Sequence, residues 1–226
     1  MPESSAPREE STIEGSPPCI AAAGPLALEL DTRPRERFIS GRGAEEVVLS
    51  YELLKRLDVE LLHPSLVNRV IDMLSSCRLV GFDYWAVSGF RSAPEQQALY
   101  EQGRSRPGNI VTSARAFQSA HNFGLAIDFA HDRDLARGGL QDGWSPEEYE
   151  VLGVQARAHG LVWGGDLAFS DRPHVQLPGY VTATQLAPLR AVYLDAPERG
   201  RDVRSRLRSK LQAVWLHIDT GDAAFA

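Results

Sequence analysis

The chain has 226 residues and is 43% hydrophobic, which is enough for one folded domain with a hydrophobic core. Its net charge of −6 and pI of about 5.5 argue against the basic surface of a nucleic-acid-binding domain, so no nucleic-acid partner is expected. No stretch approaches the roughly 18 consecutive apolar residues of a membrane span. With only two cysteines, Cys19 and Cys77, any metal must be held by His and carboxylate side chains.

The first 35 residues differ in composition from the rest of the chain. They hold six of the fourteen prolines, interspersed with Ser, Glu and Ala. This composition predicts a flexible leader over residues 1–35, followed by a folded domain over residues 36–183. The amino terminus lacks a positively charged stretch followed by an apolar one, so no signal peptide is evident.

The first half of the folded domain predicts three helices and a strand. Leucines at helical spacing indicate a helix over residues 49–62, and a second helix follows over Pro64–Ser76. Aromatic and β-branched residues favour a strand over Phe82–Ser88. Beyond Arg91, a capping-box pattern begins a helix that ends near Gly103.

The second half adds further short elements. A polar loop over residues 104–118 leads to a strand over Leu125–Ala130. A second capping-box pattern, in residues 145–148, begins a helix that ends near His159. Short strands are expected over Leu161–Trp163 and Val175–Leu177. Because the strands and helices do not alternate strictly, the pattern indicates an α+β domain.

Residues 184–226 form a predicted helical tail with two possible roles. Apolar residues recur at helical spacing from Val203 to Ile218, and basic residues crowd the start of this stretch. Such a helix can pack on the domain through its apolar stripe. A basic amphipathic helix can also contact an anionic surface.

The stretch from Ser119 to Phe129 carries the first candidate ligands. In a strand, Leu125, Ile127 and Phe129 face the core, while Asp128 faces the other way among small residues. His121 precedes the strand and can turn back over this open face. A carboxylate on a floor of Gly and Ala leaves room for a bulky ligand.

The stretch from Trp163 to Leu177 carries the second set of candidate site residues. Val175 and Leu177 are expected to face the core, which leaves His174 and Gln176 on the open side. Two imidazoles, one carboxylate and a water make a tetrahedral zinc site with an open position, and His121, Asp128 and His174 can supply the protein ligands. Hydrolysis also needs a base, which Asp171 can supply, and an oxyanion partner. Arg91 can serve as that partner.

Three motifs, in this order, resemble those of a known peptidase family. They are Ser88-Gly89-Phe90-Arg91-Ser92, then Ser119-x-His121-x-x-Gly124-x-Ala126-x-Asp128, then Trp163-Gly164-Gly165 with Asp171-x-Pro173-His174. The chain resembles, over residues 53–177, the zinc D-Ala-D-Ala carboxypeptidase and L-alanyl-D-glutamate endopeptidase family. That family includes phage endolysins and VanY- and VanX-like enzymes. It implies a hedgehog- and DD-peptidase-like fold, a small antiparallel sheet with flanking helices.

The resemblance implies a role for each matching residue. His121, Asp128 and His174 match the Zn²⁺ ligands, Asp171 the catalytic acid and base, and Arg91 the arginine that polarises the scissile carbonyl. Gln118 and Ser119 match positions near the substrate-binding groove. Trp163 either packs in the core or lines that groove. Leu167 departs from the aromatic residue that many relatives carry, which leaves the specificity of the groove open.

The resemblance also implies an activity. Aspartate at position 171 matches the endolysin-type branch, so the expected reaction is hydrolysis of the L-Ala–D-Glu bond in peptidoglycan stem peptides. A D-Ala-D-Ala carboxypeptidase or dipeptidase is the alternative on the same site. A non-catalytic zinc module that binds the cell wall is the alternative of another class, although binding alone needs no base. The protein is expected to stay in the cytoplasm until it is released to the wall.

Overall fold

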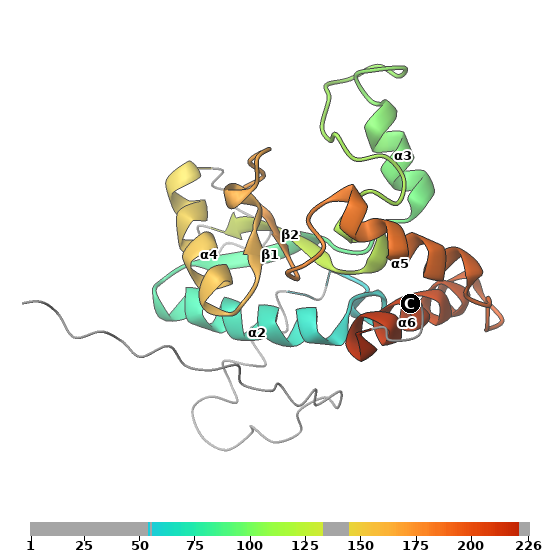
Figure 1. Cartoon of the computed structure of the whole chain (residues 1–226). Coiled ribbons are helices and arrows are strands. Elements are labelled where there is room, and N and C mark those ends of the chain that lie inside the picture. Colours follow the sequence, from blue (N-terminus) through green and yellow to red (C-terminus); the bar gives the residue numbers. More distant parts are fainter. Residues whose placement is uncertain (1–53, 55, 133–144, 222–226) are drawn as a thin grey trace, which may run out of the picture. The chain divides into compact units, whose positions relative to one another are not determined.

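The computed structural model describes residues 54, 56–132 and 145–221 (Figure 1). The predicted leader over residues 1–35 lies outside the described residues, as does the first part of the helix expected over residues 49–62. In the described part of this stretch, the structure differs from the expected α-helix. This part holds only a 3-10 helix, η1 (Val59–Leu61), because the Asp58 side chain caps the chain there. None of the described helices is long and apolar enough to span a membrane.

The sheet has four antiparallel strands in the order β1-β2-β4-β3. The strands are β1 (Asp83–Ser88), β2 (Ala126–Asp132), β3 (Val162–Trp163) and β4 (His174–Gln176). Ser88 of β1 lies opposite Asp128 of β2, and Asp128 lies opposite His174 of β4. The register therefore places these three side-chain positions in one row across the sheet.

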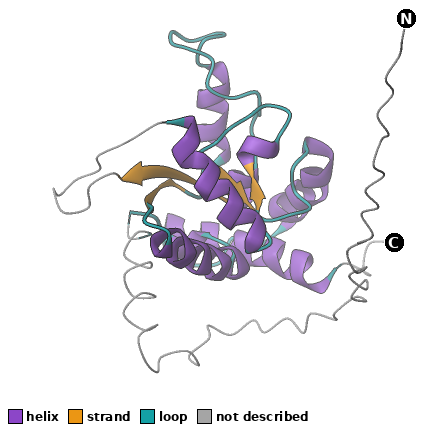
Figure 2. Cartoon of the chain, turned by 90° about the vertical axis from the view of Figure 1, so that its left-hand side faces the viewer, coloured by secondary structure: helices purple, strands orange, loops and turns teal. Residues whose placement is uncertain are grey.

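Helices surround these strands (Figure 2). Helix α2 begins at a proline after the His63 cap and packs against both β1 and α4, as Figure 1 shows. Both predicted capping boxes are confirmed, Ser92 with Glu95 and Ser145 with Glu148. The helices are α2 (Pro64–Leu79), α3 (Ala93–Glu101), α4 (Pro146–Ala158), α5 (Ala183–Asp195) and α6 (Val203–Thr220).

The hydrophobic core lies on both sides of β2. Leu125, Ile127 and Phe129 are fully buried, as the alternation predicts. The other face is less open than expected, because Ala126 and Ala130 are also buried. β2 is an inner strand with protein packed on both faces, so only the neighbourhood of Asp128, which is partly exposed, stays accessible.

The two carboxy-terminal helices contact each other and add to this core. Leu211, Val214 and Trp215 of α6 are buried within the same hydrophobic cluster as the sheet residues. The basic start of α6 makes ion pairs with acidic residues elsewhere in the chain. These pairs join Arg204 to Asp58 and Glu60, Arg208 to Glu60, and Arg206 and Lys210 to Glu198.

Candidate active site

His121 is held in a short 3-10 helix, η2 (Ala120–Phe123), immediately before β2. The Ser119 side chain caps η2 by accepting the backbone N–H of His121, and Gly124 ends it in the left-handed conformation. The Nδ1 atom of His121 lies 2.7 Å from the carbonyl oxygen of Gly89. Because a carbonyl can only accept, Nδ1 carries the proton and Nε2 presents its lone pair to the site.

His174 is the first residue of β4 and is buried. Its Nε2 atom lies 2.9 Å from Oε1 of Gln176, and its Nδ1 atom faces the site. There, Oδ1 of Asp128 lies 3.0 Å from this Nδ1 and 3.1 Å from Nε2 of His121. The two ring nitrogens are 3.2 Å apart. The structure thus brings together the three side chains expected to bind metal.

This donor set fits a tetrahedral cation such as Zn²⁺. With metal–ligand bonds of about 2.0–2.1 Å, tetrahedral geometry separates neighbouring ligand atoms by about 3.3 Å, close to the distances observed. Two neutral imidazoles whose outer nitrogens donate leave two lone pairs and a carboxylate oxygen facing one another. Three acceptors at such distances repel one another unless a cation lies between them.

The electrostatics around Asp128 agree with a cation site. Burial alone raises the pKa of Asp128, but positive charge and donated hydrogen bonds from His121 and His174, which a bound cation would replace, more than reverse this and hold the pKa well below its usual range. Asp128 is therefore a carboxylate at neutral pH, which is the form that binds metal.

Asp171 lies on the loop that leads into β4. Its backbone N–H donates to Gly164, and its carbonyl accepts the N–H of His174 at 3.0 Å. A Cβ at Gly164 would overlap the carbonyl oxygen of Asp171, so this close approach requires glycine in the Trp163-Gly164-Gly165 motif. Partial burial, and then the nearby Asp128 carboxylate, raise the pKa of Asp171 above its usual value. A carboxylate of raised basicity is suited to accepting a proton.

Arg91 enters the site from the segment after β1. Its Nη2 atom donates to Ser88 Oγ at 2.9 Å and lies 3.5 Å from Oδ2 of Asp128, while Nη1 donates to Gln96 Oε1 at 3.0 Å. Its backbone is tied to η2, because Arg91 N donates to the carbonyl oxygen of His121. Arg91 therefore presents a fixed positive charge beside the candidate metal ligands.

The remaining expected site residues occupy different environments. Ser119 is partly exposed beside the site, whereas Gln118 is exposed and accepts the backbone N–H of Arg115. Trp163 is 2% exposed and donates through Nε1 to the carbonyl oxygen of Arg172 at 2.7 Å. Its ring is enclosed by protein, which favours the core role over contact with a substrate.

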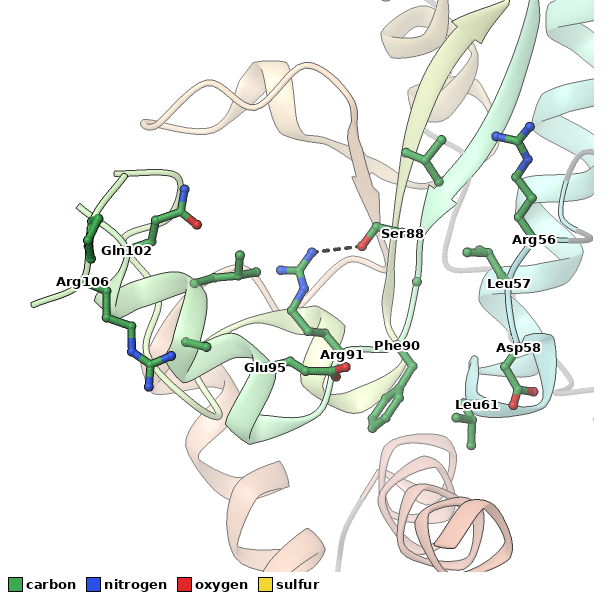
Figure 3. A pocket seen from close by; sticks show the side chains of 15 residues that line it. Arg56, Leu57, Asp58, Leu61, Ser88, Phe90, Arg91, Glu95, Gln102 and Arg106 are labelled. Atoms are coloured by element: carbon green, nitrogen blue, oxygen red, sulfur yellow. Dashed lines mark hydrogen bonds between the residues drawn. The ribbon is translucent and has the colours of Figure 1, made fainter. Parts of the chain in front are cut away.

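A hollow of about 680 Å³ adjoins Arg91 (Figure 3). Figure 3 shows the Arg91 guanidinium turned towards Ser88, with residues of α3 on one side and residues 56–61 on the other. Apolar and charged side chains line this hollow, called the Arg91 hollow below. They include Leu57, Leu61, Val87, Phe90, Ala98, Leu99, Arg56 and Arg106.

Sequence reasoning missed the residues that orient the reactive groups. Gln96 is fully buried and accepts from Arg91, and its own amide donates to Ala114 O at 2.8 Å. Oε1 of Gln176 and the carbonyl oxygen of Gly89 lie within hydrogen-bonding distance of the outer nitrogens of the two imidazoles. A backbone carbonyl leaves no trace in the residue type, but a Gln two residues after His174 on the same side of a strand was a usable signal.

Two imidazoles and a carboxylate, with a second carboxylate and an arginine beside them, are the groups that hydrolases with a catalytic metal use. Residues 59–164 match the family model VanY, described as D-alanyl-D-alanine carboxypeptidase. A peptidoglycan L-alanyl-D-glutamate endopeptidase of Bacillus subtilis, CwlK, is 40% identical over 124 residues, which cover 51% of this chain and 73% of that protein. The chain therefore belongs to the VanY family of peptidases, peptidase family M15.

Two solved structures are also similar over part of the chain. One is the vancomycin resistance D,D-pentapeptidase VanY from a VanB-type cassette, in complex with Zn(II), with a TM-score of 0.41 and 18% identity. The similar region covers 55% of this chain and 76% of the VanY chain. The other is the L,D-carboxypeptidase DacB of Streptococcus pneumoniae, with a TM-score of 0.38, 23% identity, and 56% and 71% coverage.

Proposed function

We propose that this protein is a zinc-dependent peptidase that hydrolyses the L-Ala–D-Glu bond of peptidoglycan stem peptides. The observation that carries the proposal is the group of three acceptor atoms, on His121, Asp128 and His174, with Asp171 and Arg91 beside it. The substrate is inferred from the 40% identity to CwlK, a peptidoglycan L-alanyl-D-glutamate endopeptidase.

The chain's own residues divide the work of hydrolysis. Zinc, held by the two imidazoles and Asp128, would supply a water of lowered pKa and a Lewis acid at the scissile carbonyl. Asp171 accepts a proton from the attacking water, whose oxygen bonds to the carbonyl carbon of L-Ala. The Arg91 guanidinium stabilises the negative charge that develops on the carbonyl oxygen. Asp171 then donates its proton to the departing amino group of D-Glu.

We also assign the Arg91 hollow to the part of the stem peptide next to the scissile bond. Arg91 and Ser88 line the hollow and Arg91 also lies beside Asp128, so a peptide bound in the hollow would contact the guanidinium next to the candidate metal ligands. Ala98, on the α3 wall, offers a test. Ala98→Phe is expected to raise KM while leaving zinc affinity unchanged, and an unchanged KM would contradict the assignment.

The experiment that tests the function is digestion of purified peptidoglycan with and without a chelator, followed by mass spectrometry of the products. Release of peptides with new D-Glu amino termini, abolished by the chelator and restored by zinc, supports the proposal. Release of terminal D-Ala alone would replace it with a D,D-carboxypeptidase, the activity that names the matching family model. Stoichiometric zinc binding without any product would identify a binding module.

A further inference from the structure

We propose that Gln176 is a positioning residue that selects Nδ1 of His174 as the metal-binding nitrogen. Gln176 is 3% exposed and lies two residues after His174 in β4, so both side chains emerge from the same side of the strand. The inference rests on the metal site of the proposed function, and it adds the way in which the fold determines the tautomer of one ligand.

The orientation of the Gln176 amide follows from its neighbours. Its nitrogen lies 2.8 Å from the carbonyl oxygen of Tyr180 and 3.4 Å from that of Leu177. Carbonyl oxygens only accept hydrogen bonds, so the amide NH₂ group must face them. The reversed amide would place Oε1 against Tyr180 O and bury two acceptors in contact, which is costly.

The turn after β4 brings this carbonyl into place. Pro178 and Gly179 occupy the two central positions between Leu177 and Tyr180, and Gly179 has a φ of +89°. Proline followed by a glycine of positive φ is the pattern of a type II turn, which reverses the chain tightly. The turn returns the Tyr180 backbone to the side chain of Gln176, which lies four residues earlier.

The tautomer of His174 follows from the amide. With its NH₂ group engaged, Gln176 presents Oε1 to Nε2 of His174 at 2.9 Å. An amide oxygen only accepts, so Nε2 carries the proton and Nδ1 keeps its lone pair. This Nδ1 atom lies 3.0 Å from Asp128 Oδ1 and 3.2 Å from His121 Nε2, within the candidate metal site. Metal-binding histidines generally donate their other N–H in this way, which orients the ring and supports affinity.

The matched control comes from the second buried glutamine of the site. Gln96 is as enclosed as Gln176 and also accepts through Oε1, but from Arg91 rather than from a candidate ligand. Replacement by Met preserves the approximate size of the side chain and removes the strong acceptor. Gln176→Met should therefore weaken zinc binding, whereas Gln96→Met should lower turnover through Arg91 and leave zinc affinity unchanged.

The test measures the zinc dissociation constant by competition with a chromogenic chelator, on purified full-length protein without substrate. Gln176→Met is expected to lose about 10- to 100-fold in affinity. Equal zinc affinity in wild type and Gln176→Met would overturn the inference.

A second measurement does not depend on how well the variants fold. Nitrogen-15 NMR of the zinc-loaded wild type should show a protonated Nε2 and a metal-bound Nδ1 at His174. A metal-bound Nε2 at His174 would overturn the inference even if the protein proved to be an active peptidase. Wild-type protein that binds no zinc would instead contradict the proposed function, so the two failures are distinguishable.

Discussion

The indole Nε1 of Trp215 donates a hydrogen bond of 2.9 Å to the carbonyl oxygen of Phe123. This bond joins α6 to η2, the short helix that carries His121. Tyr193 of α5 makes ring contacts with Phe123 and with Phe117, which precedes the site. The carboxy-terminal helices therefore support the backbone of a candidate metal ligand, although they lie beyond the residues that match the family model.

Trp215→Phe is expected to destabilise the protein by about 1–3 kcal/mol, because the buried carbonyl of Phe123 loses its donor. Denaturant unfolding measures this change. Leu216→Ala is the control, since Leu216 is the next residue of α6 and is 65% exposed. It should change the free energy of unfolding by less than about 0.5 kcal/mol. Similar losses in both variants would show that the indole hydrogen bond is not responsible.

Asp171→Asn should lower kcat about 10²- to 10⁴-fold, because the amide cannot accept the proton of the attacking water. Zinc content should stay stoichiometric, since Asp171 is not among the three grouped ligand atoms. Asp166→Asn is a matched control, because that exposed carboxylate pairs with Arg157. Turnover of defined muropeptides measures both variants. Wild-type kcat in zinc-loaded Asp171→Asn would exclude the assigned role.

Acidification should weaken the junction between α2 and α6 through His63. Its Nδ1 atom accepts the backbone N–H of Ser65, and Nε2 lies 3.2 Å from Oδ1 of Asp219. Burial lowers the pKa of His63 although Asp219 opposes this effect. Below about pH 6.5, His63 therefore binds a proton more readily in the unfolded chain than in the folded one. The free energy of unfolding falls as the pH decreases through that value.

The measurement for this prediction compares thermal unfolding at about pH 7.5 and about pH 5.5. His63→Asn, which keeps a helix-capping oxygen, should lose less stability than wild type over this interval. The two proteins cannot differ in their loss of unfolding free energy by more than about 1.4 kcal/mol per pH unit, because only one proton is involved. An identical pH dependence in the two proteins would show that His63 does not contribute.

Gly124→Ala should destabilise the fold by at least about 2 kcal/mol. Gly124 has a φ of +68°, and a Cβ there would overlap the carbonyl oxygen of Leu61. Gly81→Ala separates the strain of a positive φ from the steric overlap, because Gly81 has a φ of +86° but no atom within 4 Å of the added Cβ. Unfolding free energies should show a smaller loss for Gly81→Ala, of about 1–2 kcal/mol. Equal losses would mean that backbone strain alone accounts for the effect.

Local sequence rules predicted those elements that local interactions determine. Ser92 with Glu95 and Ser145 with Glu148 begin helices as expected, because each capping box satisfies backbone donors within four residues. The helix expected over residues 49–62 failed in its described part. There Asp58 caps only a short 3-10 helix, and Pro64 restricts His63 to an extended conformation.

The sequence by itself determined which residue types the site contains, since the spacing of His121, Asp128, Asp171 and His174 matches one peptidase family. Only the tertiary structure decided how they meet. The antiparallel register aligns Ser88, Asp128 and His174, and the backbone of Gly89 reaches His121. The enclosure of Trp163 and the buried amides of Gln96 and Gln176 were likewise decided by packing. The strand register and the contact between Gly89 and His121 join segments far apart in the chain, and hydrophobic periodicity describes only neighbours along it.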